Sequence, residues 1–97
     1  MARFDVFRIS DGTLVLDCQS NGLTHLNTRF VVPLWPPANA PLAASRMNPV
    51  LKIDGKDFVM VTQFAAAVAL VQLREQVTTL SDSHFSILAA LDFLIGG

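Results

Sequence analysis

The side chains able to do acid–base or nucleophilic chemistry are few and lie far apart in this sequence. His25 and His84 have no nucleophile near them, and neither a glycine-rich phosphate loop nor a zinc-binding spacing is present. Cys18 is the only cysteine, which excludes an internal disulfide and a cysteine-based metal site. A lone cysteine in a strand is more typical of a small core residue than of a nucleophile. We therefore expect no catalytic residues, no metal and no cofactor, and a protein that is not an enzyme.

The composition also argues against nucleic acid as a direct partner. Seven basic and eight acidic residues give a formal charge of −1, and only 15% of the 97 residues are charged while 52% are hydrophobic. Nucleic-acid-binding domains normally carry a basic stripe. A chain of this length forms one domain, residues 1–97, and is too small to bury every apolar side chain. The remaining apolar surface is typical of a protein interface.

The expected compartment is the cytoplasm. The N-terminal residues lack the long apolar stretch of a signal peptide. The longest uninterrupted apolar run, residues 64–71, is far shorter than the roughly 18 residues that a membrane span requires. We expect no membrane association.

The first third of the chain predicts three strands. Residues 3–9 and 13–19 flank the turn sequence Ser10-Asp11-Gly12, which indicates a hairpin. Residues 29–34 form the third candidate, and Pro33 is expected to place the end of this strand at an edge or exit of the sheet. Residues 35–49 are rich in proline and alanine and predict a loop with one helical turn around residues 42–46.

The next segment contains the clearest local signal. Asp54-Gly55 separates two β-favouring runs, and this pair predicts a two-residue hairpin because both turn positions require positive φ. Residues 63–77 are ambiguous, since their alanines favour a helix whereas their valines favour a strand.

Residues 85–95 predict a C-terminal helix, with Ser81 as N-cap and Gly96-Gly97 ending it. The helix is apolar almost all round, although one stripe stands out: Phe85, Leu88, Leu91 and Ile95. A helix of this kind must be buried on more than one side. We expect one side to pack on the sheet and another to meet a partner, and the residues predicted for the dimer or partner surface are Leu91, Leu94, Ile95 and Trp35.

The order of these elements resembles the CcdB family, the toxins of plasmid-type toxin–antitoxin pairs. The similarity spans essentially the whole chain and is carried by residues 4–7 (Phe-Asp-Val-Phe), 16–20 (Leu-Asp-Cys-Gln-Ser), 31–34 (Val-Val-Pro-Leu), 48–53 (Asn-Pro-Val-Leu-Lys-Ile), 60–63 (Met-Val-Thr-Gln) and 80–81 (Leu-Ser). Each segment is weakly specific, whereas their order and spacing are distinctive.

The resemblance implies a mainly β (α+β) fold, with a small antiparallel SH3-like or β-barrel sheet and a C-terminal α-helix, as in CcdB and the MazF ribonucleases. It implies that residues 66–77 are largely strand. It also implies a homodimer that binds the A subunit of DNA gyrase, traps the cleaved-DNA complex and is neutralised by a CcdA-like antitoxin.

By the same resemblance, the gyrase-binding residues are Phe4 near the N-terminus and Phe93 near the end of the helix. Leu94, Ile95, Gly96 and Gly97 stand where the family has a Trp-Gly-Ile tail. Two alternatives stay open: a MazF-like endoribonuclease, for which Arg3, Arg8, Arg29 and Arg46 are available, and a dimer of this fold that binds an antitoxin but has lost gyrase poisoning.

Overall fold

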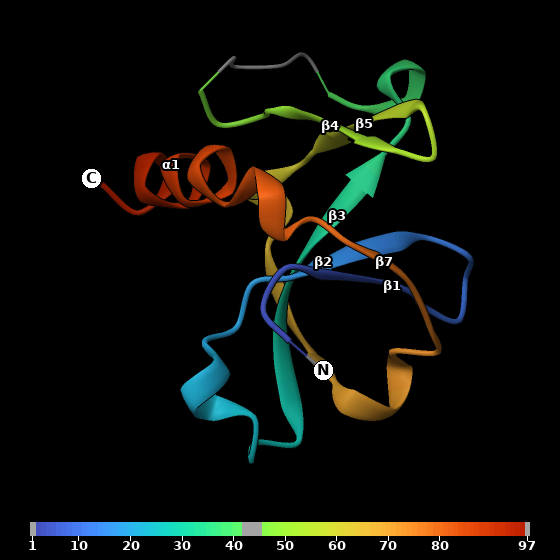
Figure 1. The fold of residues 1–97 in the computed structure, drawn as a ribbon, viewed down its shortest axis with the longest axis vertical. Helices are drawn as coiled ribbons and strands as arrows, with labels where there is room; N and C mark the ends of the chain where they lie inside the picture. The colour runs from blue at the N-terminus through green and yellow to red at the C-terminus, as the bar shows by residue number, and fades with distance from the viewer. Residues whose placement is uncertain (1, 42–45, 97) are drawn as a thin grey trace.

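A computed structural model describes residues 2–41 and 46–96 (Figure 1). Strands with 3-10 turns between some of them run along the chain, and one α-helix follows them. The strands are β1 (Asp5–Arg8), β2 (Leu14–Asp17), β3 (Thr28–Trp35), β4 (Val50–Ile53), β5 (Lys56–Met60), β6 (Ala66–Ala69) and β7 (Glu75–Thr79), and the helix is α1 (His84–Leu94).

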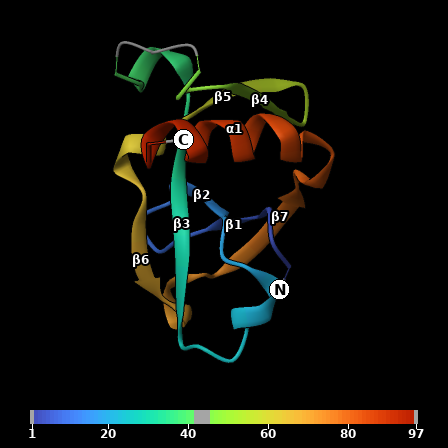
Figure 2. The same ribbon diagram turned by 90° about the vertical axis from the view of Figure 1, so that its left-hand side faces the viewer.

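All strand pairs are antiparallel, and the sheet order is β4-β5-β3-β2-β1-β7, with β6 paired to the first half of β3. The sheet curls into a half-barrel, and α1 lies against it between the β4–β5 hairpin and the β1–β2 layer (Figures 1 and 2). The predicted fold class, a small antiparallel β-barrel-like sheet with a C-terminal helix, is confirmed.

The sequence of β1 and β2 is apolar on both sides because the sheet is buried on both sides. Val6 and Leu16 belong to the main core beneath the helix, whereas Phe7 and Val15 pack with Val31 in a second, smaller core on the other face. The predicted hairpin between these strands is present. Its turn is closed by a hydrogen bond from the Ile9 backbone N–H to the Thr13 carbonyl at 3.0 Å.

The Asp54-Gly55 hairpin is confirmed. Asp54 and Gly55 have φ angles of 53° and 77°, and they join β4 to β5. A type I′ turn requires this left-handed conformation at both positions, which aspartate tolerates and glycine adopts without steric cost.

Pro33 does not end β3 as expected; it lies inside the strand, opposite Val15 of β2. Its carbonyl accepts a hydrogen bond from the Val61 N–H at 3.0 Å. Because the N and O atoms of one strand residue point to the same side, the missing N–H of Pro33 also faces this side. On that side of β3 the neighbouring strand changes from β6 to β5, whereas β2 lies on the other side. The proline therefore interrupts no hydrogen bond between β3 and β2.

Two further predictions concern the middle of the chain. Residues 66–77 are largely strand: they contain β6 and the first part of β7, with a 3-10 turn at Leu70–Gln72 between them. The helical turn expected around residues 42–46 falls mainly on residues outside those described. A 3-10 turn is found earlier, at Pro37–Asn39.

The helix prediction is correct to within one residue, but its cap differs. Ser81 opens a 3-10 turn that precedes α1, and the position before α1 is Ser83, whose side chain makes no capping hydrogen bond. The buried residues of α1 are Ile87, Ala90 and Leu91. Phe85, at the start of the predicted apolar stripe, is 79% exposed, because the sheet contacts the helix along the side that carries Ile87, Ala90 and Leu91.

A buried ion pair joins β2 to β3. The guanidinium of Arg29 donates two hydrogen bonds to Asp17 Oδ2, from Nε at 2.9 Å and from Nη2 at 2.5 Å, and both side chains are almost fully shielded from solvent. Asp17 Oδ1 accepts from the Gln19 N–H at 3.0 Å. The Gln19 side chain in turn accepts from the Phe30 N–H and donates to the Leu23 carbonyl. These bonds fix the connection between the two strands.

Replacing one member of this pair should destabilise the fold strongly. Asp17→Leu or Arg29→Met leaves a buried charge without its partner, so each should lower the free energy of unfolding in urea by about 3–5 kcal/mol. The double variant Asp17→Leu/Arg29→Met removes both charges. Its loss of unfolding free energy should therefore be clearly smaller than the sum of the two single losses. Additive losses would contradict a direct coupling between the two side chains.

Candidate functional site

The exposed end of α1 forms an apolar patch, which we call the helix-end patch: Phe93, Leu94 and Ile95. Phe93 is 43% exposed and Ile95 is 78% exposed, although both are large and apolar. The helix ends here because Gly96 adopts a φ of +96°, the left-handed conformation that is common just after a helix. The Ile95 N–H still bonds to the Leu91 carbonyl at 3.1 Å, which keeps the patch in helical register.

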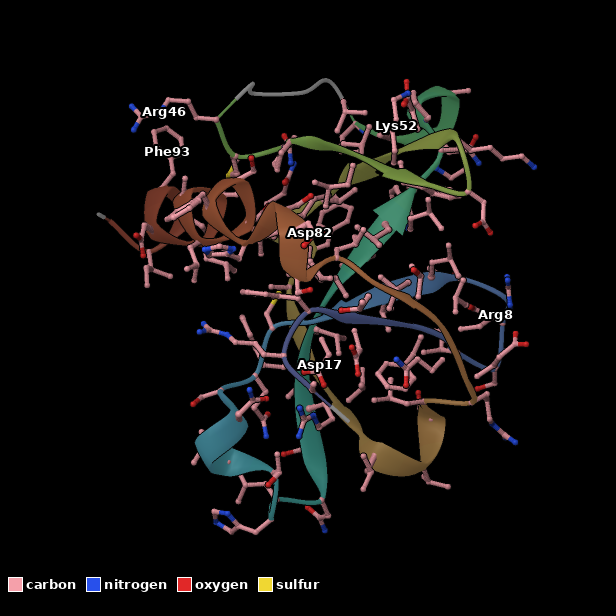
Figure 3. All side chains as sticks on the ribbon, in the orientation of Figure 1. Arg8, Asp17, Arg46, Lys52, Asp82 and Phe93 are labelled. Carbon is pink, nitrogen blue, oxygen red and sulfur yellow. The ribbon has the colours of Figure 1, made fainter. Side chains whose placement is uncertain are left out.

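A cation borders this patch. The Arg46 guanidinium carbon lies 5.1 Å from the centre of the Phe93 ring, a cation–π contact between the segment before β4 and the end of α1 (Figure 3). In the parts of the chain that the structure covers, Arg46 has no carboxylate partner. Its N–H donors remain available to a partner that covers Phe93.

The structure brings only some of the predicted site residues to this patch. Phe93, Leu94, Ile95 and Gly96 lie together at the end of the helix, whereas Gly97 falls outside the described residues. Leu91, 9% exposed, packs in the core and anchors the patch from beneath.

Phe4 is 6% exposed and lies in the same core as Leu91. Its φ of 73° is unusual for a bulky residue, and this conformation is held by backbone hydrogen bonds to Asp17 and Leu80. Trp35 is half-buried at the far end of β3, where it meets the Phe64 ring edge-on at 5.5 Å.

A second apolar surface lies next to the helix end. Strand β6 pairs with β3 on one side, and no strand covers its other edge among the described residues. Ala66, Ala67 and Ala69 of this strand are exposed, and the preceding 3-10 turn, Thr62–Phe64, contacts α1. Figure 2, viewed from the side at which α1 ends, shows β6 beside β3 on this side of the molecule. An uncovered strand edge with small apolar side chains favours association.

The titratable groups do not form an obvious reactive centre. Cys18 is buried, and its desolvation, with a smaller contribution from the Asp17 charge, raises the pKa of the thiol to about 12. His25 lies exposed in a loop, and His84 Nδ1 lies 3.0 Å from the Ser81 carbonyl oxygen. Within the described segments, no group of three or more His, Cys, Asp or Glu side chains is arranged to hold a metal ion. None of the described helices is both long and apolar enough to cross a membrane.

Comparison with protein families assigns this architecture. The family model described as CcdB protein matches residues 3–97. The chain belongs to the CcdB family. As a CcdB-family member it is the toxin of a toxin–antitoxin pair and has an antitoxin as partner. No curated protein sequence matches the chain.

A solved structure of similar fold corrects one expectation. The CcdB-family chain is similar to a structure named "Endoribonuclease from Mycobacterial species", with a TM-score of 0.81 and 14% sequence identity over 99% of this chain and 91% of that one. The expectation that the chain is not an enzyme is therefore contradicted: a protein named as an enzyme carries this fold. The exclusion rested on reactive residues being scattered in sequence, and folding can bring such residues together from different strands.

Sequence reasoning missed two features of this region. The sequence offers Arg46 only as a candidate for RNA binding, and its contact with Phe93 has no signal there because the two are far apart along the chain. Arg29 was a second RNA-binding candidate, but the structure buries it against Asp17. The sequence signal available for the Asp17–Arg29 pair was Asp17 itself, a carboxylate at the end of an otherwise apolar strand.

The buried thiol should behave as an unreactive core group. A thiol-specific reagent at mildly alkaline pH should label Cys18 at a rate set by unfolding. Because its folded-state pKa is raised from 9.0 to about 12, the thiol contributes stability that is fully present below pH 9 and lost as the pH rises toward 12. Cys18→Val should therefore gain stability relative to the parent chain across that range, as measured by urea unfolding. Rapid labelling of the folded protein would contradict this.

Proposed function

We propose that this CcdB-family toxin binds the DNA gyrase A subunit through the helix-end patch and stabilises the cleaved-DNA complex, and that its antitoxin reverses this. The observation that carries the proposal is the exposed apolar end of a helix that is anchored in the core by Ile87, Ala90 and Leu91. A rigid element loses little conformational entropy on binding, so its apolar side chains contribute fully to affinity.

The chemistry of the patch differs from that of the family tail. Leu94 stands where the family has a tryptophan, so the aromatic contact must come from the neighbouring Phe93 ring. Arg46 lies over that ring and adds a cation that a tryptophan tail alone would lack. Burying Ile95 against a partner would contribute about 1.5–3 kcal/mol. The altered tail thus retains an apolar anchor and an aromatic group, and we infer that it retains a protein target.

A homodimer is part of the same proposal. The uncovered edge of β6, its exposed alanines and the neighbouring Phe64 offer a self-complementary surface. This surface lies on the side of the molecule at which α1 ends (Figure 2). A two-fold axis beside β6 would therefore bring the two helix-end patches of the dimer near each other.

The patch can be tested with a matched pair of variants. Ile95→Ser should weaken gyrase binding roughly 10- to 150-fold, because it removes about 1.5–3 kcal/mol of apolar burial. Phe85→Ser is the control, since Phe85 is equally exposed but lies at the other end of the same helix. The measurement is trapping of cleaved DNA by purified gyrase.

Sedimentation should show the same oligomeric state for both variants and the parent chain. Equal loss of activity in the two variants would contradict docking by the helix end. An inactive parent chain would contradict gyrase as the target.

An endoribonuclease is the second candidate, and the observation that favours it is the fold shared with a protein named for that activity. Arg29 is held by Asp17 inside the protein, so the arginines predicted for RNA contact that remain accessible are Arg3, Arg8 and Arg46. Incubation with RNA at low salt tests this: cleavage that is lost on substitution of one of these three arginines would support it, and intact RNA would contradict it.

A further inference from the structure

An open cavity of about 640 Å³ lies on the side of the molecule away from the helix-end patch. It is formed where the β1–β2 hairpin approaches the end of β3 and the 3-10 turn that follows. Arg8 marks this region in Figure 3, at the opposite side of the molecule from Phe93 and Arg46. Its volume is in the range of cavities that bind small molecules.

The inner wall of the cavity is apolar and partly aromatic. Trp35 and Phe58 line it together with the buried side chains of Leu14 and Leu34. The Trp35 indole is fixed by its edge-on contact with Phe64 on one side, so its position does not depend on a ligand. A flat ring system is the shape of ligand that such a wall accommodates best, because stacking on an indole rewards planarity.

The rim carries a cation that is already oriented. Arg8 donates from Nε to Glu75 Oε1 and from Nη1 to the Gly12 carbonyl, both at 3.3 Å. Two of the five guanidinium N–H groups are thereby occupied, and the others remain for an anionic group of a ligand. The Arg8 side chain is 46% exposed, so an anion can reach it.

The remaining polar residues of the cavity complement a sugar and a base edge. Asp11 Oδ1 accepts from the Thr13 N–H at 2.9 Å, the Thr13 side chain is a second hydrogen-bond partner of this carboxylate, and the exposed Asp11 side chain can still accept from a ligand hydroxyl. The Asn39 side chain makes no hydrogen bond to any residue in the described ranges, so its amide can both donate and accept. Amides of this kind pair well with the edge of a nucleobase.

We propose that this cavity binds one ribonucleotide unit: the base against Trp35, its edge at Asn39, a ribose hydroxyl at Asp11 and the phosphate at Arg8. The unit is either a free nucleotide or one residue of single-stranded RNA. The site is separate from the helix-end patch and does not depend on gyrase binding, so a failure here leaves that proposal intact.

Trp35 makes the test direct, because it is the only tryptophan and the chain has no tyrosine. Each ribonucleoside monophosphate is titrated while tryptophan fluorescence is followed, and at least one should give a saturable change. The matching nucleoside and ribose 5-phosphate should bind more weakly. An oligoribonucleotide of the same base separates the two sources: tighter binding than the monomer identifies RNA, and equal binding identifies the free nucleotide.

Arg8→Gln should weaken binding of the nucleotide about 10-fold or more, because a charge-assisted contact is lost, and leave binding of the nucleoside unchanged. Arg74→Gln is the control: Arg74 is exposed, its N–H bonds to the Arg8 carbonyl, and its side chain does not line the cavity. Asn39→Ala should change the preference among bases. The proposal is overturned if no nucleotide gives a saturable change, if nucleoside and nucleotide bind equally, or if the two arginine variants behave alike.

Discussion

The ion pair between Asp17 and Arg29 is the interaction on which the rest of the structure depends. It joins the end of β2 to the start of β3, and β3 is the strand that pairs with β2, β5 and β6 in turn. Two charges are costly to bury, and they persist here because the carboxylate also accepts a backbone N–H and the guanidinium donates twice to it. In return the strand has one register. In this register, the first half of β3, with Phe30, pairs with β6, and Trp35 lies at the other end of β3.

The fold leaves two separate surfaces open to a partner or ligand, one on each side of the molecule. The sheet covers only a narrow stripe of α1, so a helix that is apolar all round leaves Phe93 and Ile95 in solvent at its end. The cavity beside Trp35 lies away from this end and combines an apolar wall with polar residues at its rim. The first surface has the character of a protein-docking site, because exposed apolar side chains gather at the end of the helix. The second is concave and polar enough to select a small ligand.

Local signals made much of the fold predictable, and long-range contacts account for what the sequence did not reveal. Asp54-Gly55 identifies its hairpin because positive φ at both positions is a property of the turn itself. Residues 63–77 are ambiguous by propensity, and only the family resemblance indicates strand there, since β6 is a strand only because β3 lies beside it. The sequence does not show which side of α1 is buried, because a helix without a polar face has no internal signal for orientation. The Arg46–Phe93 contact and the cavity around Trp35 are created by folding, and no spacing in the sequence encodes them.

Family membership and fold likeness therefore bear on different questions. The match to the CcdB family covers residues 3–97 and makes the chain a toxin, whereas the endoribonuclease resembles it in fold at 14% identity. A shared fold does not transfer chemistry, because chemistry depends on which side chains reach solvent. Arg29 illustrates this: on this backbone an arginine at the start of β3 is withdrawn from solvent by the carboxylate of Asp17, and without that carboxylate the same position would have an unpaired cation. The half-barrel thus fixes where groups can be presented, and individual residues decide whether a given arginine supports the core or meets a substrate.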